Sequence, residues 1–154
     1  MLERLPECAT AAGYGCVQLD SAGFMTAAHA LYRSRGFVDM RGLNCESCRR
    51  ATAAPVAAFV GFSEGSVRFR GDARRLFSSS AGVERSYCAN CGTPLSYRAT
   101  RWPGEIHLYT PTFDNPATYP PSFHVHWAEK LPWLAVTDNL PRYERASTPD
   151  GAAQ

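Results

Sequence analysis

The stretch Ser86–Arg98, SYCANCGTPLSYR, contains the features that decide the fold. Cys88 and Cys91 form a C-x-x-C pair, and Gly92 follows directly, where it permits the positive φ that such a turn needs. A C-x-x-C turn supplies two sulfurs from one short segment, and zinc takes such thiolates as ligands in a tetrahedron. We therefore expect a zinc-binding turn here, with short strands on either side of it.

A second C-x-x-C pair, Cys45 and Cys48, is separated from the first by residues 49–87. This gap is longer than the roughly 15–20 residues of compact zinc ribbons. A thioredoxin-like redox role is the alternative, but neither pair is predicted to follow a strand and open a βαβ unit. The two remaining cysteines, Cys8 and Cys16, are expected to pack as small apolar side chains.

The composition is that of a globular protein. The chain has 154 residues, of which 45% are hydrophobic and 19% charged, so we expect one domain with at most a small appendage. No apolar run approaches the roughly 18 residues of a membrane span, and the N-terminus lacks the pattern of a secretory signal. We therefore expect no membrane partner, a reducing cytoplasmic location and free thiols rather than disulfides.

The charge pattern argues against a nucleic-acid partner. The formal net charge is +2, and the arginines are scattered among acidic residues. Such a pattern is typical of a solvated surface, so we expect no nucleic-acid partner.

Downstream of residue 42 the sequence favours β-structure. Short runs rich in β-branched and aromatic residues are separated by Gly and Pro. These runs lie within residues 54–70, 74–88, 91–99, 105–113, 122–129 and 132–138. Their spacing predicts a mainly β fold of small antiparallel sheets. Residues 146–154 are expected to form a frayed tail.

The first forty residues have a different sequence pattern from the rest of the chain. Residues 13–21 alternate like a strand, and 24–37 place apolar side chains at helical spacing. LDS followed by MTAAHALYRSRGFVDM resembles the C-terminal end of GNAT-type N-acetyltransferases, with Tyr32 at the position of the tyrosine near the acetyl-CoA sulfur. We find no pyrophosphate-binding turn to match, so residues 1–41 are interpreted as an acetyltransferase-like remnant without acetyl transfer.

The rest of the chain carries a more specific resemblance. LNCESC, SYCANCGTPLSYR, TFDNP, PSFHVHWAEKLPW and DNLPRY occur in this order. Together they resemble the glutathione-dependent formaldehyde-activating enzyme family over residues 42–145. The resemblance implies a β-tent fold with two zinc sites and a carbon–sulfur lyase that acts on adducts of a small thiol such as glutathione. It also implies that Cys88 and Cys91 hold a structural zinc and that Cys45 and Cys48 hold a catalytic zinc.

The sequence departs from the family pattern at the metal ligands. Leu43 stands where the resemblance implies the first cysteine of the catalytic C-x-C-x-x-C, and the early C-x-C strand of the structural site has no match. Three outcomes remain open: both pairs converge on one Cys₄ zinc, Cys16 or a histidine replaces a ligand, or zinc is lost. We expect a zinc-dependent carbon–sulfur lyase with one or two zinc ions. The alternative is a non-catalytic, zinc-stabilised binding module.

Other polar residues are further candidates. His107, His124 and His126 lie on predicted strands, and the period of two places the last two on one face. Such a pair could complete a metal site or contact substrate, or the histidines could be structural. Arg49 and Arg50 follow Cys48 and could attract the carboxylates of a glutathione-like ligand, or they could be ordinary exposed charges.

Overall fold

The computed structural model describes residues 37–146 and is mainly β, as expected. Its strands are β1 (Phe37–Leu43), β2 (Ala57–Ser63), β3 (Arg74–Ser80), β4 (Val83–Cys88), β5 (Pro94–Ala99), β6 (Glu105–Tyr109) and β7 (Phe123–Val125). A helix, α3 (Glu46–Thr52), follows β1, and four 3₁₀ turns complete the elements: η1 (Glu64–Ser66), η2 (Thr110–Thr112), η3 (Pro116–Thr118) and η4 (Trp127–Glu129).

Several predictions fall on residues that the structure does not describe. They are the acetyltransferase-like strand and helix before residue 37, the packing of Cys8 and Cys16, and the tail after residue 146. The predicted boundary between residues 41 and 42 falls inside β1. No helix among the described residues is long and apolar enough to cross a bilayer.

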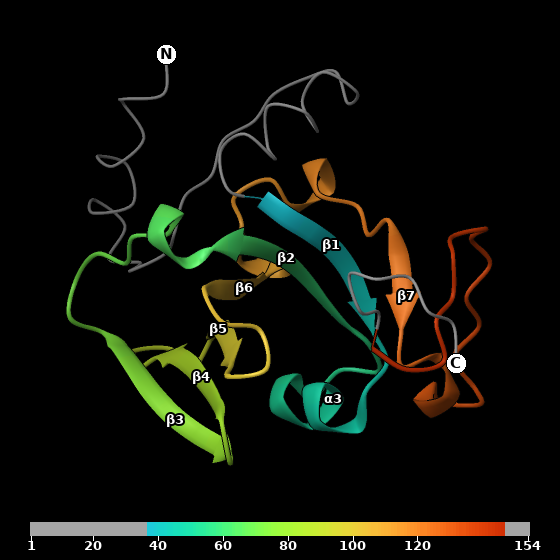
Figure 1. Cartoon of the computed structure of the whole chain (residues 1–154), viewed down its shortest axis with the longest axis horizontal. Helices are drawn as coiled ribbons and strands as arrows, with labels where there is room; N and C mark the ends of the chain where they lie inside the picture. The colour runs from blue at the N-terminus through green and yellow to red at the C-terminus, as the bar shows by residue number, and fades with distance from the viewer. Residues whose placement is uncertain (1–36, 147–154) are drawn as a thin grey trace.

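The strands form one seven-stranded mixed sheet in the order β3-β4-β5-β6-β2-β1-β7, so the prediction of small antiparallel sheets was wrong. All neighbours are antiparallel except β1 and β7, which pair in parallel with Gly42 opposite His124. Figure 1 shows β7 beside β1 at one end of the sheet and β3 at the other. The segment from residue 110 to 122 carries the chain across the sheet, and this crossover makes β7 parallel to β1.

Two of the predicted β-rich runs do not form strands. Residues 67–70 follow η1 as irregular chain, and residues 132–138 contain no strand. In the second segment Leu134 N donates to Leu131 O at 3.0 Å and Lys130 Nζ donates to Leu134 O at 2.7 Å. These hydrogen bonds occupy backbone groups of the segment within a turn, so the segment does not pair with a strand of the sheet.

The central strands bury side chains on both faces of the sheet. Because successive residues of a strand point to opposite faces, Phe59 and Val60 of β2 belong to different core clusters. One cluster consists of Leu43, Cys48, Ala57, Phe59, Tyr97, Ala99, Tyr109 and Val125, and the other of Val60, Phe62, Ile106, Leu108, Phe113 and Tyr119. Burial of each large apolar side chain contributes about 1.5–3 kcal/mol.

Helix α3 covers the first of these clusters, and the end of β1 fixes its position. Asn44 is 1% exposed, and its backbone N–H and side-chain amide both donate to Val125 O, at 3.2 and 3.4 Å. Cys45 is the N-cap residue, and Ala53 ends the helix in the left-handed region with φ 51°. The chain therefore leaves β1 beside β7 and turns back over the sheet, and α3 lies below β1 and β2 in Figure 1.

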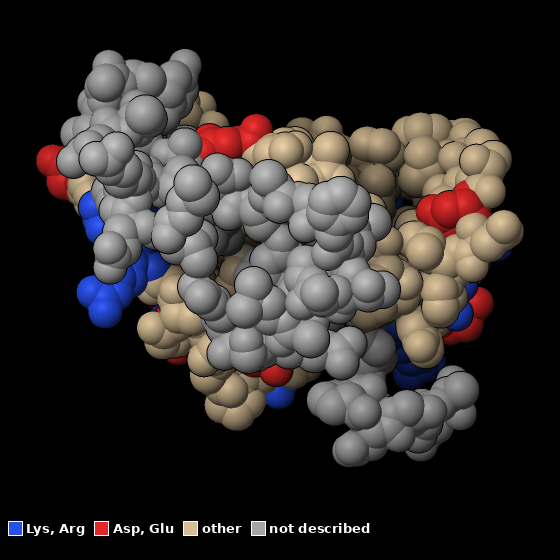
Figure 2. Space-filling model, turned by 90° about the horizontal axis from the view of Figure 1, so that it is seen from above, with Lys and Arg blue, Asp and Glu red and all other residues tan. Residues whose placement is uncertain are grey.

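Charges are mixed on the face that Figure 2 shows. Basic side chains gather at the left edge of this view, others are visible at the lower right, and acidic side chains lie among them. That the protein has no nucleic-acid partner stays a prediction.

Candidate functional site

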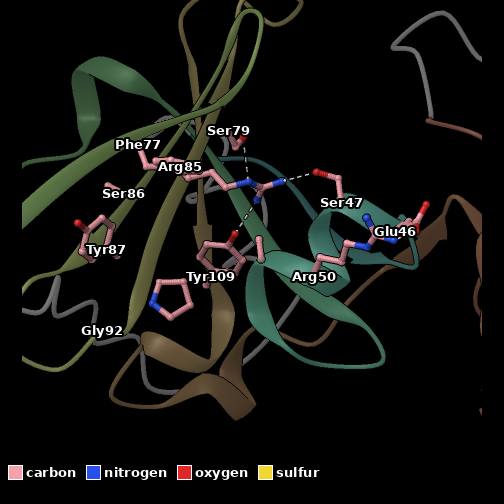
Figure 3. A pocket seen from close by; sticks show the side chains of 12 residues that line it. Glu46, Ser47, Arg50, Phe77, Ser79, Arg85, Ser86, Tyr87, Gly92 and Tyr109 are labelled. Atoms are coloured by element: carbon pink, nitrogen blue, oxygen red, sulfur yellow. Dashed lines mark hydrogen bonds and ion pairs between the residues drawn. The ribbon is translucent and has the colours of Figure 1, made fainter.

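A cleft of about 590 Å³ separates α3 from the β3–β4 hairpin. Its volume lies in the range of small-molecule sites, roughly 300–1,000 Å³. The residues that line it are Glu46, Ser47, Arg50, Ala51, Phe77, Ser79, Arg85, Ser86, Tyr87, Gly92, Pro94 and Tyr109. Helix α3 supplies one wall, and the strands supply the other wall and the floor (Figure 3).

Arg85 is the buried cation of this cleft. It is 8% exposed, and its guanidinium donates to Ser79 Oγ at 3.2 Å, Tyr109 Oη at 2.8 Å and Ser47 Oγ at 3.1 Å. Figure 3 shows these three bonds converging on the guanidinium from β3, β6 and α3. The same group lies over the ring of Tyr97, 5.0 Å from its centroid.

No carboxylate among the described residues pairs with Arg85, because its polar partners are three hydroxyl groups and the sulfur of Cys48 at 4.0 Å. Burial of a charge is costly unless an opposite charge or strong hydrogen bonds offset it. Arg85 therefore provides a positive site, already oriented by three hydroxyl groups, for an anionic ligand in the cleft.

The two arginines that follow Cys48 have different environments. Arg50 lines the cleft and forms an exposed ion pair with Glu46. Arg49 instead donates to the backbone carbonyls of Asn44 at 2.8 Å and Glu129 at 3.1 Å, so it fastens α3 to the chain after β7. Arg50 therefore lies where it can contact a ligand carboxylate, as predicted, whereas Arg49 does not.

Cys45 is the N-cap residue of α3 and Cys48 lies in its first turn, and both are free thiols. The Cys48 backbone N–H donates to Cys45 Sγ at 3.2 Å, and the two side chains are hydrogen-bonded to each other. The hydrogen bond from the Cys48 side chain, with the Cys48 backbone and His126 assisting, lowers the pKa of Cys45 to about 6 against the opposing effect of burial. The same pairing and burial raise the pKa of Cys48.

Cys88 and Cys91 form the predicted turn at the end of β4. Gly92 N donates to Cys88 O at 2.8 Å, and Gly92 has φ 74°, as the sequence predicted. Cys88 is buried, whereas Cys91 is exposed with its Sγ 3.0 Å from Thr93 Oγ1. The hydrogen bond from Thr93 lowers the pKa of Cys91.

The structure does not bring the two cysteine pairs together. Within residues 37–146 no three His, Cys, Asp or Glu side chains cluster where they could hold a metal ion. Leu43 is 9% exposed and packs in the core, so it leaves the Cys45–Cys48 pair without the third sulfur that the family resemblance implies. That Cys45, Cys48, Cys88 and Cys91 bind zinc stays a prediction.

The histidines have protein partners of their own. His124 Nε2 is 2.9 Å from Asp138 Oδ2, His126 Nδ1 is 2.8 Å from Glu129 Oε1, and His107 is buried beside Glu105. The two-residue periodicity does not apply to the pair of His124 and His126. β7 ends at Val125 and His126 has φ 54°, so His126 lies outside the strand.

Three residues that are central to the cleft were not predicted from the sequence: Arg85, Ser47 and Tyr109. Arg85 is a charged residue inside a β-rich run, and its register opposite Tyr97 turns it toward the covered face. A charged residue at an inward-facing position of a strand can indicate a functional site. The sequence alone does not show which face of the sheet α3 covers, so the inward position of Arg85 could not be recognised.

Comparison with known proteins agrees with the resemblance. The sequence model of the family "Glutathione-dependent formaldehyde-activating enzyme" matches residues 37–129, from the start of β1 to the end of η4. No curated protein matches the chain. The matched region contains the whole sheet, both C-x-x-C pairs and every residue of the cleft. The chain belongs to the glutathione-dependent formaldehyde-activating enzyme family.

Proposed function

We propose that this protein binds a small thiol of the glutathione type, or its adduct with a small aldehyde, in the α3 cleft, and that it forms or cleaves the carbon–sulfur bond of that adduct. The observation that carries the proposal is the buried guanidinium of Arg85, which faces the cleft without a carboxylate partner in the described chain. Membership of an enzyme family named for glutathione and formaldehyde supports the same ligand.

The cleft suits a ligand of this kind in charge and in size. A thiol–aldehyde adduct of glutathione is anionic through its carboxylates, and its sulfur becomes anionic when the carbon–sulfur bond breaks. Arg85 offers charge-assisted hydrogen bonds to such an anion, which are stronger than those between neutral groups. Arg50 on the rim provides a second cation for a carboxylate.

The electrons and protons of the proposed reaction balance with the residues of the cleft. When the adduct cleaves, the electron pair of the carbon–sulfur bond stays on sulfur, the hydroxyl group loses its proton, and the carbonyl of the aldehyde forms. Arg85 stabilises the thiolate as its charge develops. Among the described residues Glu46 is the only carboxylate that lines the cleft, and we assign it the role of taking the hydroxyl proton. The reverse sequence of steps forms the adduct.

Zinc was part of the expected mechanism, since proteins of this family generally bind it. The donors of the described chain do not fit such an ion at the cleft, because α3 contributes two sulfurs and Leu43 replaces the third. The proposed steps therefore use only protein side chains. That Cys16 or a histidine supplies the missing ligand stays a prediction.

The buried guanidinium of Arg85 also favours a second candidate function, a binding module that holds the thiol ligand without turnover. Isothermal titration with glutathione and S-methylglutathione measures binding, and exchange NMR between glutathione and its formaldehyde adduct measures turnover. Arg85→Gln removes the buried charge, and Arg75→Gln removes an exposed charge outside the cleft lining as a matched control.

The proposal expects binding and accelerated exchange in the parent protein and in Arg75→Gln, with both lost or strongly weakened in Arg85→Gln. Binding of the ligand without accelerated exchange indicates the non-catalytic binding module. If the folded parent protein binds neither glutathione nor S-methylglutathione, both candidate functions are contradicted. Elemental analysis of zinc per chain, repeated on Cys45→Ser, determines whether the pair on α3 contributes to a metal site.

A further inference from the structure

The α3 cleft has an apolar wall beside its buried cation. Phe77 of β3 and Tyr87 of β4 both line the cleft, and they are 60% and 40% exposed. Exposed apolar groups that polar residues surround mark surfaces that bind a ligand or a partner. We propose that the α3 cleft selects adducts of aldehydes that carry an aromatic or large apolar group, in preference to the formaldehyde adduct. This inference rests on the proposed function and names the substrate class of the same site.

The pairing of β3 with β4 places the two rings beside Arg85. Phe77 stands directly opposite Arg85, and such residues share one face of the sheet with their Cβ atoms about 4.5–5.5 Å apart. Tyr87 follows Arg85 by two residues in β4, so its side chain points to that same face. Figure 3 shows Tyr87 on the side of Arg85 away from Ser47 of α3. The guanidinium therefore has α3 on one side and an aromatic wall on the other.

The cleft is open beside this wall. Pro94 of β5 pairs with Tyr87 and also lines the cleft, so the apolar wall continues onto the next strand. Gly92 lines the cleft as well, and a Cβ at Gly92 would meet no atom of the described residues within 4 Å. Space for an apolar group thus lies next to the rings, in the same cleft of about 590 Å³ that contains the guanidinium.

A formaldehyde adduct leaves the apolar wall without a partner. Its carbon carries only hydrogen atoms besides the sulfur and the hydroxyl group, and the glutathione portion is mainly polar. When Arg85 holds the sulfur, a substituent on the neighbouring carbon lies within reach of the ring of Phe77, because the two residues are directly opposite each other. An aromatic substituent there would remove apolar surface from water and pack against a ring, and both effects favour binding.

The reaction is the one proposed above with a different aldehyde. During cleavage the electron pair of the carbon–sulfur bond stays on sulfur, the hydroxyl group gives its proton to Glu46, and the carbonyl group of an aromatic aldehyde forms in place of formaldehyde. The reaction needs no oxidant and no further co-reactant. The substituent takes no part in the bond changes and acts through binding alone, so the selectivity should also appear in the affinity for stable thioethers.

Binding of two thioethers tests the apolar wall separately from the reaction. S-methylglutathione and S-benzylglutathione differ only in the group on sulfur, and isothermal titration of the full chain measures both dissociation constants. Phe77→Thr and Tyr87→Thr each remove one ring and introduce a residue that favours strands. Leu76→Thr is the matched control, because Leu76 is similarly exposed at 55% but points to the other face of β3 and does not line the cleft. Circular dichroism checks the fold of each variant.

The proposal expects the parent protein to bind S-benzylglutathione about 5- to 10-fold more tightly than S-methylglutathione, which is the effect of burying roughly half of an aromatic ring. The ratio of the two dissociation constants should fall by about half or more in Phe77→Thr and in Tyr87→Thr. The ratio should keep its parent value in Leu76→Thr. If one ring variant does not fold, the other decides.

Two results would overturn the inference while the proposed function stands. The parent protein binds S-methylglutathione but binds S-benzylglutathione no more tightly, or the preference for S-benzylglutathione persists unchanged in the ring variants. A control variant that loses the preference as fully as the ring variants also contradicts a specific role for the wall. If the folded parent protein binds neither thioether and no glutathione, the proposed function fails and this inference fails with it.

Discussion

Replacement of Arg85 by glutamine separates a ligand-binding role from a structural one. In the folded protein the guanidinium makes three hydrogen bonds to hydroxyl groups, each worth about 0.5–1.5 kcal/mol, so their loss destabilises the fold. The substitution also removes a buried charge that has no carboxylate partner in the described chain, which relieves a penalty of several kcal/mol. These effects oppose each other, so we expect the free energy of unfolding to change by less than about 2 kcal/mol.

Binding should respond much more strongly than stability. A hydrogen bond to a charged group contributes about 1.5–3 kcal/mol, which corresponds to a dissociation constant for glutathione about 10- to 150-fold larger in Arg85→Gln. Arg85→Lys keeps the charge and loses the fork of donors, so its affinity should lie between the two. Calorimetric titration measures the affinities, and urea unfolding measures the stabilities. If affinity is unchanged in Arg85→Gln while stability falls by more than about 4 kcal/mol, Arg85 is structural and the reasoning fails.

Three other perturbations test the site and its support. Gly42→Ala should lower the unfolding free energy by about 1–3 kcal/mol, because a Cβ there meets His124 Nδ1 at 2.7 Å; a neutral result in urea unfolding would show that the imidazole moves freely. Leu108→Ala should cost about 2–5 kcal/mol in the same assay and leave glutathione affinity unchanged, since Leu108 lies in the core cluster opposite the cleft. The alkylation rate of Cys45, followed by peptide mass, should rise with pH through a midpoint of about 6 and then level off. In Cys48→Ala the midpoint should move upward, because the hydrogen bond that lowers the pKa is lost, and an unchanged midpoint would contradict that cause.

The strands were predictable because their residues obey local rules. The β-rich runs in 74–88 predicted β3 and β4, the alternation in 105–113 predicted β6, and Gly92 after a C-x-x-C pair predicted a turn with positive φ. The parallel pairing of β1 with β7 was not predictable. It depends on a crossover and on a three-residue strand whose partners include residues 141–143.

The site was harder to predict than the fold because it depends on what α3 covers. Arg49 and Arg50 are neighbours in sequence, yet one binds backbone carbonyls and the other faces the cleft. The environment of Arg85 depends on α3, which places Ser47 and Cys48 against its guanidinium. Such contacts join residues far apart in the chain, and no periodicity within either segment encodes them.

The two C-x-x-C pairs show why equal spacing does not imply equal chemistry. Cys88 and Cys91 lie in a turn after an antiparallel strand, where Cys91 is exposed to solvent and bonds only to its own loop. Cys45 and Cys48 lie at the start of a helix that is pressed onto the sheet, so Cys48 meets a guanidinium from another strand. The reactivity of a thiol depends on such neighbours and on access. Because Cys48 Sγ lies 4.0 Å from the Arg85 guanidinium, the reactivity of the α3 pair should depend on Arg85, whereas that of the turn pair should not.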